Sequence, residues 1–275
     1  MTRGNVIAVW GPAGAPGRTT MAITIAAELA AAGYSVVLAD ADTHSGSIAA
    51  ALGLLDESPG FAAACRLARN EQLTISELER IADRYRSPNG SFWVLTGIGR
   101  PSRWPELSDE RVALTLDTCR DWVDFTVVDL ASSLERDEEL SSDMAVPRRN
   151  AATLATLRVA DQVVAVGAAD PVGVSRFLRS RADLLEAAST DQVTVLMNRL
   201  RAGAIGLNPA AQIHGALERF GDIREAVLIP HDLIACDTAV LIAKTLTDAA
   251  PKSTVRLAIR SLVADRISTQ VTNVA

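Results

Sequence analysis

The sequence predicts an α/β fold: one doubly wound domain with a mostly parallel, twisted sheet of seven or eight strands and helices on both faces. A series of short apolar runs is the first observation behind this prediction. Strands that are covered on both faces are apolar throughout instead of alternating, and these runs have that character. They are Val6–Trp10, Ser35–Ala39, Phe92–Thr96, Phe125–Val128, Gln162–Val166, Val193–Met197 and Ala226–Ile229. The second observation is that helical patterns separate the runs, and such alternation is typical of a parallel sheet.

The helices are predicted from apolar periodicity and from start and stop signals. The first spans Thr19–Ala32 and ends at Gly33, a glycine stop signal. In the helix predicted over Ser76–Tyr85, Ser76 and Glu79 have the spacing of a capping box. The other predicted helices are Phe61–Arg69, Asp109–Trp122, Ala151–Ala160, Val172–Ala188, Pro209–Phe220, Asp237–Thr247 and Thr254–Ile267.

The organisation of the chain is that of one domain. No Ser/Gly-rich linker, low-complexity segment or internal repeat interrupts the sequence, so we expect one domain over residues 1–275 with its core in residues 5–268. The segment Gly97–Leu107 is the least regular part and is predicted to be a surface loop. The region from Trp93 to Trp104 has two interpretations, a partner surface or ordinary packing.

Composition and charge narrow the class of protein. The 275 residues are 48% hydrophobic and carry a formal net charge of −6. An acidic chain is not built to coat nucleic acid, so we do not expect nucleic-acid binding, and we interpret Arg176, Arg179 and Arg181 on one predicted helix as a solvated face. The three cysteines are too far apart in sequence for a metal cluster or a disulfide framework, which indicates a reducing compartment.

The sequence shows no pattern of a targeting signal, which favours the cytoplasm. The first residues lead directly into the first predicted strand, and we expect no signal peptide. No apolar run approaches the ~20 residues that a membrane span needs. We therefore expect a cytoplasmic protein, and peripheral attachment at the inner face of the cell membrane is the alternative.

The most informative segment is Val6–Thr20, an apolar strand, a loop of Gly, Pro and Ala, and then Arg-Thr-Thr at the start of a helix. This is the layout of a phosphate-binding loop, in which backbone N–H groups and the positive end of a helix face the phosphates. Pro16 removes one backbone donor, and Arg18 replaces the usual Lys with a larger planar cation. Thr19 stands where a hydroxyl reaches Mg²⁺. The alternative is an ordinary strand–helix turn without a ligand. The residues predicted to bind phosphate are Gly14, Ala15, Gly17, Arg18, Thr19 and Thr20.

Carboxylates follow two of the predicted strands. Asp40 and Asp42 end the second strand, and because alternate residues of a strand point the same way, both are predicted to face the phosphate loop. There one of the two carboxylates could hold a Mg²⁺-bound water, and the other could orient an attacking water. Asp129, after the strand Phe125–Val128, has the Walker B pattern of a Mg²⁺ carboxylate. The alternative is that these are aspartates at solvated strand ends.

Two late segments complete the predicted site. Asn198 follows a strand, and its amide has the donor and the acceptor that read a purine edge. Pro230 and Asp232 lie where the last strand breaks, and irregular backbone there would cover the base. A plain loop start at Asn198 and a plain turn at Pro230 are the alternatives. All these sites follow the carboxyl ends of strands, where nucleotides bind in open α/β sheets.

In order and spacing these segments resemble the MinD/ParA family of deviant-Walker ATPases, from Val6 to about Ile267. The family loop, Lys-Gly-Gly-x-Gly-Lys-Thr-Thr, corresponds to Ala13–Thr20. The resemblance implies a P-loop NTPase fold, binding of ATP or ADP with Mg²⁺, and a nucleotide-dependent homodimer. It also implies a role for each matched residue: water orientation by Asp42, the Walker B carboxylate at Asp129, adenine recognition by Asn198, and the base loop at Ile229–Asp232. With Asp42 in that role, Asp40 is assigned to Mg²⁺, and Arg18 is the catalytic cation.

Two positions depart from that family. Ala13 stands where the family has a signature Lys that reaches across the dimer to the partner's phosphates, and Arg18 replaces the loop Lys. These departures imply slow or absent hydrolysis, so the protein is a weak ATPase at most. The altered loop is most similar to the CpaE/TadZ branch, which positions Tad/Flp pilus machinery. The implied partners are therefore proteins of pilus, secretion or division machinery. The alternatives are an active chromosome-partitioning or division-site ATPase and a scaffold with a relic loop that binds no nucleotide.

Two further segments have open interpretations. The amphipathic pattern of Thr254–Ile267 favours the last packing helix of the domain, and the alternative is a membrane anchor. Arg148 and Arg149 follow the acidic segment Leu130–Val146. One hypothesis is that either arginine replaces the missing Lys at the phosphates, and the alternative is a helix start with surface charge.

Overall fold

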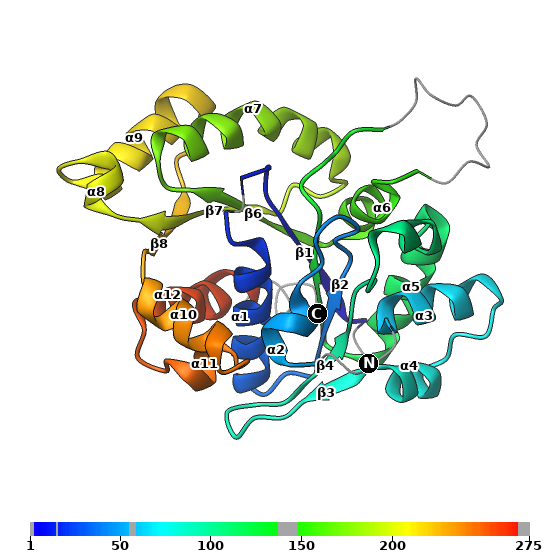
Figure 1. Ribbon diagram of the computed structural model, residues 1–275. Helices are drawn as coiled ribbons and strands as arrows, with labels where there is room; N and C mark the ends of the chain where they lie inside the picture. The colour runs from blue at the N-terminus through cyan, green and yellow to red at the C-terminus, as the bar shows by residue number, and fades with distance from the viewer. Residues whose placement is uncertain (1–2, 15, 55–58, 137–147, 269–275) are drawn as a thin grey trace.

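A computed structural model describes residues 3–14, 16–54, 59–136 and 148–268 (Figure 1). One eight-stranded sheet forms its centre, in the order β3-β4-β2-β5-β1-β6-β7-β8. Neighbouring strands are parallel except β3 and β4, which are antiparallel. The strands are β1 (Asn5–Trp10), β2 (Val36–Asp40), β3 (Asp83–Tyr85), β4 (Phe92–Leu95), β5 (Phe125–Asp129), β6 (Gln162–Ala168), β7 (Val193–Leu200) and β8 (Ala226–Pro230).

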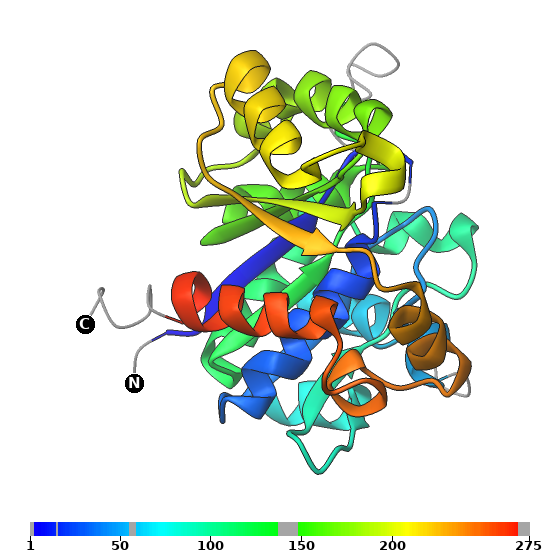
Figure 2. The same ribbon diagram turned by 90° about the vertical axis from the view of Figure 1, so that its left-hand side faces the viewer.

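Helices cover both faces of the sheet (Figures 1 and 2). One face packs on α1 (Arg18–Ala31), α2 (Ile48–Leu52), α10 (Leu233–Leu241), α11 (Leu246–Ala249) and α12 (Thr254–Leu262). The other face packs on α3 (Gly60–Arg69), α4 (Ile75–Ile81), α5 (Asp109–Trp122), α6 (Ala151–Val159), α7 (Pro171–Ala187) and α9 (Pro209–Gly221). A short helix, α8 (Ala202–Ile205), precedes α9. Every residue of β2 and β5 is buried, and burial on both faces explains why these strands are mostly apolar up to the aspartates that end them. The predicted doubly wound α/β fold is confirmed.

The predicted helix Ser76–Tyr85 is wrong at both ends. The helix α4 begins one residue earlier, and its cap is the hydroxyl of Thr74, which accepts a hydrogen bond from the N–H of Glu77. The predicted capping box is therefore displaced toward the N-terminus. After α4 the chain forms β3, whose Tyr85 ring stacks on Phe92 of β4 with 4.9 Å between centroids. This cross-strand contact lies outside any local helical pattern, so the sequence did not reveal the eighth strand.

Two more predicted segments differ from the structure. The predicted helix Asp237–Thr247 is two helices, α10 and α11, because the chain turns at Ala243 with φ of 53°. A left-handed residue of this kind ends an α-helix. The predicted loop Gly97–Leu107 contains a 3₁₀ helix, η1 (Pro101–Glu106).

The last described helix packs against the sheet. One apolar face of α12 and of the π-helical turn after it, η2 (Val263–Ile267), is buried with α1 in one core through Val255, Ile259, Leu262, Val263 and Ile267. Arg256 of α12 donates to the buried carboxylate of Glu28 in α1 at 2.7 Å. The helix α12 therefore packs inside the domain through its apolar face, as in the favoured interpretation of Thr254–Ile267. None of the helices in the described ranges is both long and apolar enough to cross a bilayer.

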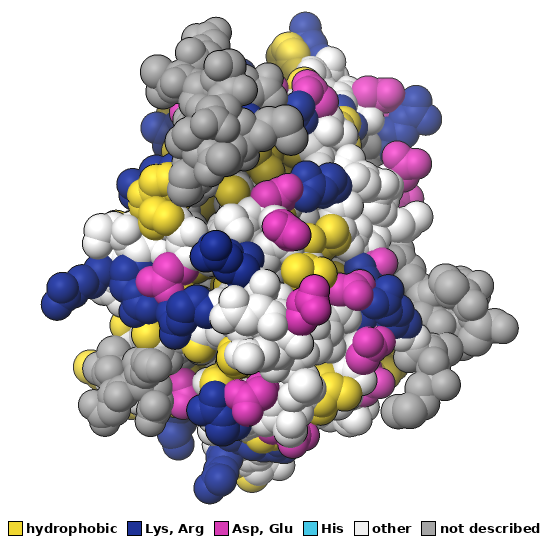
Figure 3. Space-filling view, turned by 90° about the vertical axis from the view of Figure 1, so that its right-hand side faces the viewer, with side chains coloured by type: hydrophobic (Ala, Val, Ile, Leu, Met, Phe, Trp, Pro, Cys, Tyr) yellow, Lys and Arg dark blue, Asp and Glu magenta, His cyan; other side chains and the backbone are white. Residues whose placement is uncertain are grey.

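Figure 3 shows the face formed by α3 to α6, on which basic and acidic side chains are interspersed. Ion pairs on these elements include Arg158 with Asp109. The ring of Trp93 lies 5.4 Å from that of Trp122, and the guanidinium of Arg84 lies 4.5 Å from the Trp93 ring. Trp93 therefore takes part in packing between β4 and its neighbours.

Candidate nucleotide site

Three predicted segments meet at one end of the sheet. β5 lies between β1 and β2, and Asp40 at the end of β2 pairs in register with Asp129 at the end of β5. Val9 of β1 also pairs with Asp129, so the loop after β1 begins beside both carboxylates. β1 has β5 on one side and β6 on the other, which makes this the topological switch point where open α/β sheets bind ligands.

Gly17 turns the loop into α1. Its φ is 97°, in the left-handed region that glycine adopts without strain. A Cβ at this position would lie 2.6 Å from Nδ2 of Asn198, which donates to the carbonyl of Pro16 at 2.8 Å. Glycine is therefore required both by the turn and by the close approach of β7. Ala15 lies outside the described residues.

The guanidinium of Arg18 lies within the loop. Its Nη1 donates to the carbonyls of Gly11 at 3.1 Å and Pro12 at 3.4 Å, and its Nη2 lies 3.4 Å from Oδ2 of Asp42. The side chain is 13% exposed, and its buried Nε has no partner among the described residues. Since buried donors are nearly always satisfied, this group fits an acceptor such as a phosphate oxygen.

Thr19 and Asp129 form the second part of the site. Oγ1 of Thr19 donates to Oδ2 of Asp129 at 2.6 Å, and the hydroxyl of Ser47 lies 3.3 Å from the Thr19 oxygen. The other oxygen of Asp129, Oδ1, is buried and has no partner among the described residues. Burial, and then the charge of Asp40, raise the pKa of Asp129 well above its usual range. An unpaired carboxylate oxygen beside a hydroxyl is a donor set that fits Mg²⁺, and a cation would favour its ionised form.

Asp40 and Asp42 hold the loop that follows β2. Asp40 accepts from the N–H of Asp42 at 3.1 Å and of Ile48 at 3.2 Å, and burial raises the pKa of its carboxyl to about 7. Asp42 accepts from the N–H groups of His44 and Ser45, from the Ser45 hydroxyl and from Arg18. Both carboxylates therefore sit beside the phosphate loop, as the pattern predicts, and most of their oxygens already bond to the protein.

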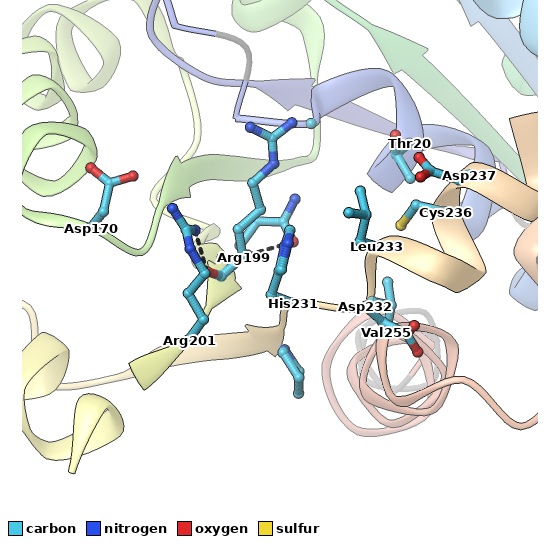
Figure 4. A pocket seen from close by; sticks show the side chains of 13 residues that line it. Thr20, Asp170, Arg199, Arg201, His231, Asp232, Leu233, Cys236, Asp237 and Val255 are labelled. Carbon is cyan, nitrogen blue, oxygen red and sulfur yellow. Dashed lines mark hydrogen bonds between the residues drawn. The ribbon is translucent and has the colours of Figure 1, made fainter. Parts of the chain in front are cut away.

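A cavity of about 470 Å³ lies between the start of α1, the end of β7 and the turn from β8 to α10 (Figure 4). This volume is that of a small-molecule site. The predicted residues that line it are Gly17, Thr20, Asn198, Pro230 and Asp232. The side chain of Asp232 caps α10 by accepting from the N–H of Ala235 at 3.2 Å. The predicted base site is thus one continuous space beside the loop.

Arg199 also lines this cavity beside Asn198, although it is not among the residues predicted to form the site. β7 has an irregular register between Met197 and Leu200, and Arg199 there has φ of 63°. The left-handed conformation costs a residue other than glycine roughly 1–2 kcal/mol, and strain of this kind collects at functional sites. Figure 4 shows the Arg199 side chain extending from β7 toward the loop before α1. Its place directly after Asn198 was the one signal in the sequence.

A hydrogen-bond network joins the Asp42 loop to the start of α6. Nε2 of His44 lies 3.1 Å from Oδ1 of the buried Asn150, whose Nδ2 donates to Ser133 at 3.0 Å. The Nε of Arg149 donates to Nδ1 of His44 at 3.4 Å, and its carbonyl accepts from Thr43. Arg149 therefore contacts the loop after Asp42. Part of the acidic segment before it, residues 137–146, lies outside the described residues.

Solved structures of two ATPases share this fold. The chain superposes on a ParA family ATPase from Chlorobium tepidum TLS with a TM-score of 0.76 and 16% identity, over 96% of this chain and 100% of that chain. It superposes on the cell division ATPase MinD from Pyrococcus furiosus with a TM-score of 0.72 and 17% identity, over 97% and 99%.

A third solved structure contains a nucleotide. The septum site-determining protein MinD from Pyrococcus horikoshii OT3, solved with Mg-ADP, superposes with a TM-score of 0.70 and 15% identity, over 96% of this chain and 97% of that chain. No protein-family model and no curated protein sequence matches this chain. The chain therefore has the P-loop NTPase fold in the form found in ParA and MinD ATPases.

Proposed function

We propose that this protein binds ATP or ADP with Mg²⁺ and acts as a nucleotide-dependent, dimerising positioning factor of the MinD/ParA type. The observation that carries the proposal is the convergence of the loop before α1, Thr19 and Asp129 at the switch point of the sheet, next to the cavity lined by Asn198. A fold alone does not define a function, so the proposal depends on these side chains.

Each part of the site has a role in this proposal. Arg18 and the loop N–H groups hold phosphate, and the unpaired Nε of Arg18 supports that role. Thr19 and Oδ1 of Asp129 would hold Mg²⁺, which bridges the outer phosphates and neutralises their charge when it is bound. Asn198 and the turn from Pro230 to Asp232 would contact the base.

Slow hydrolysis is the second part of the proposal. A residue that orients water needs a carboxylate oxygen free to accept from that water. Asp42 already accepts hydrogen bonds from His44, Ser45 and Arg18. Ala13 supplies no charge, and the large guanidinium of Arg18 bonds to the loop's own carbonyls. These contacts support slow hydrolysis of a bound nucleotide.

Dimerisation is supported by apolar side chains exposed on α10, beside the base cavity. Leu233 is 57% exposed, Ile234 81% and Leu241 84%. Exposed apolar groups that gather on one element mark an interaction surface. We propose that a second copy of the chain covers this surface when nucleotide is bound.

The cellular role that we propose is the positioning of Tad/Flp pilus or secretion machinery. The altered loop, with Ala13 and Arg18 in place of two lysines, supports this assignment. Deleting the gene should abolish surface pili, and a fluorescent fusion should gather at the pole where pili form. Chromosome loss or misplaced division septa with normal pili would instead support the active partitioning or division-site ATPase.

Calorimetric titration with ATP and ADP, with and without Mg²⁺, tests the proposed function. We expect micromolar binding of ATP that Mg²⁺ strengthens, and slow turnover in a phosphate-release assay. The surface variant Arg181→Gln serves as a matched control. If folded protein, shown to be free of ligand, binds neither nucleotide, the loop is a relic and the chain acts as a scaffold.

A further inference from the structure

The loop between β1 and α1 has a second cavity on its other flank, between the loop and the start of α7. This cavity measures about 170 Å³ and adjoins the larger cavity beside Asn198, with which it shares Asp170 and Arg199 as lining residues. Ala13 and Gly14 line it from the loop, and Arg176 of α7 and Arg199 of β7 line it from the other side. The position that lacks a Lys, Ala13, therefore faces two arginines of the same chain.

The guanidinium of Arg176 lies against the loop backbone at Gly14. A Cβ added to Gly14 would lie 2.3 Å from Nη1 of Arg176, so a side chain at this position would displace the guanidinium. Gly14 also has φ of +111°, which side-chain-bearing residues rarely adopt. Glycine at this position thus permits the guanidinium of Arg176 to touch the phosphate loop.

Arg199 reaches the same loop from the sheet. It lines both cavities, and Figure 4 shows its side chain extending toward the loop. Its backbone is left-handed at the irregular end of β7, and Nη1 of Arg201 donates to its carbonyl at 3.2 Å. The two guanidinium groups therefore approach the loop from two different elements.

The charge of this cavity is net positive. Among the described residues, neither Arg176 nor Arg199 forms an ion pair. One carboxylate, that of Asp170, lines the cavity, and its Oδ1 already accepts from the N–H of Gly173 at 2.8 Å. Two unpaired cations beside an anion-binding loop favour a phosphate group as their partner.

We propose that Arg176 and Arg199 are phosphate-binding residues of the nucleotide site, and that they supply within one chain the positive charge absent at Ala13. The inference rests on the proposed nucleotide binding and deepens it. It assigns the ligand as a nucleoside triphosphate, because the contribution of the two arginines grows with the number of phosphates near the loop. Arg149 instead contacts the imidazole of His44.

The test compares the affinities of Arg176→Gln and Arg199→Gln with wild type for ATP, ADP and adenosine. Arg179→Gln is the matched control, because Arg179 is exposed on the same helix and lines a different groove. We expect each of the two variants to weaken ATP binding about tenfold, ADP binding less and adenosine binding not at all. Arg176→Lys should recover most of the ATP affinity, and added salt should reduce the difference from wild type.

Other outcomes separate the two proposals. If wild type binds ATP and both variants bind it equally well, the arginines have no phosphate role and the inference is overturned while the proposed function stands. An equal loss of adenosine binding would also overturn the inference, since it would mean a damaged base cavity instead of lost charge. If folded wild-type protein binds no nucleotide, the proposed function itself fails. Thermal melts of each variant confirm that the compared proteins are folded.

Discussion

Three buried aspartates, Asp40, Asp42 and Asp129, share one end of the sheet, and among the described residues only Asp42 pairs with a cation, Arg18. Burial without a paired cation disfavours the ionised form of a carboxyl group, and for this reason the pKa of both Asp40 and Asp129 is raised. The site therefore carries a stability cost at neutral pH. A bound Mg²⁺ would reduce that cost by favouring the ionised form of Asp129.

Replacing Asp129 by Ala tests whether this residue holds Mg²⁺. We expect Asp129→Ala to bind ATP without Mg²⁺ as well as wild type, and to lose the strengthening that Mg²⁺ gives wild type. The physical reason is that Oδ1 of Asp129 is the unpaired buried oxygen beside Thr19. Calorimetric titration measures both affinities, with Asp109→Ala on the surface of α5 as control. A variant that still responds fully to Mg²⁺ would contradict the assignment.

The raised pKa of Asp40 leads to a prediction of how the free energy of unfolding depends on pH. Its pKa is raised by burial from 3.8 to about 7, so between these values the folded protein binds a proton that the unfolded chain does not. The free energy of unfolding then falls as pH rises from about 4 to 7, by on the order of 1–4 kcal/mol. Asp40→Asn cannot ionise and should lose less stability over this range.

Urea unfolding near pH 5 and near pH 8 measures the Asp40 effect. The slope that remains in Asp40→Asn belongs to other buried groups, of which Asp129 acts in the same direction. Equal loss of stability in wild type and variant would show that Asp40 ionises normally in the folded protein.

At the scale of elements, α1 connects the phosphate loop to the C-terminal helices. Glu28 of α1 is buried and accepts from the hydroxyl of Thr247 at 2.6 Å and from Arg256 at 2.7 Å. A buried charge that is paired on both sides holds its elements in one arrangement, because loss of either partner leaves it unsatisfied. The position of Arg18 at the start of α1 thus depends on α11 and α12 at the other end of the chain.

The packing of α12 leads to a prediction with a control on the same helix. Ile259 is fully buried and Leu257 is 39% exposed. We expect Ile259→Ala to lower the free energy of unfolding by about 2–5 kcal/mol, because it leaves a cavity in the core, and Leu257→Ala to lower it by less than about 1 kcal/mol. Chemical denaturation measures both. Similar small losses in the two variants would mean that α12 does not belong to the core.

At the scale of the whole molecule, the candidate nucleotide site and the exposed apolar residues of α10 lie on one side of the domain. The turn from β8 into α10 forms one wall of the base cavity, and Leu233 lines that cavity while it is also half exposed. A ligand in the cavity would therefore contact the element that presents the apolar surface. This arrangement supports coupling between nucleotide binding and dimerisation, since one ligand can favour one arrangement of α10.

The dimer prediction concerns Ile234, which is 81% exposed on α10. We expect wild type to form dimers in sedimentation velocity runs with ATP and Mg²⁺, and Ile234→Glu to stay monomeric, because a buried unpaired carboxylate opposes association. Leu207→Glu is the matched control, since Leu207 is 91% exposed near α9, away from this surface. Dimers of Ile234→Glu equal to those of wild type would place the interface elsewhere.

The fold class, and the sheet edge at which several candidate site residues lie, follow from local patterns in the sequence. Apolar runs separated by helical periodicity specify a parallel sheet, and residues that follow parallel strands must meet at one edge, which is why Asp42 and Asp129 were predicted to lie together. Local signals of this kind depend on residues close in the chain, and they are read without coordinates.

Contacts between residues far apart in the sequence are found in the folded structure alone. The contact of Arg176 with Gly14, the direction of Arg199 and the bond from Asn198 to Pro16 each link segments far apart in the chain. The edge strand β3 escaped prediction for another reason, since it is three residues long and pairs with the nearby β4. No local propensity encodes such contacts, because they arise when the sheet brings its strands into register and tertiary packing overrides what each segment favours alone. The sequence therefore indicates at which end of the sheet the candidate site lies. The folded structure shows that Arg176 and Arg199 are the cations beside its loop.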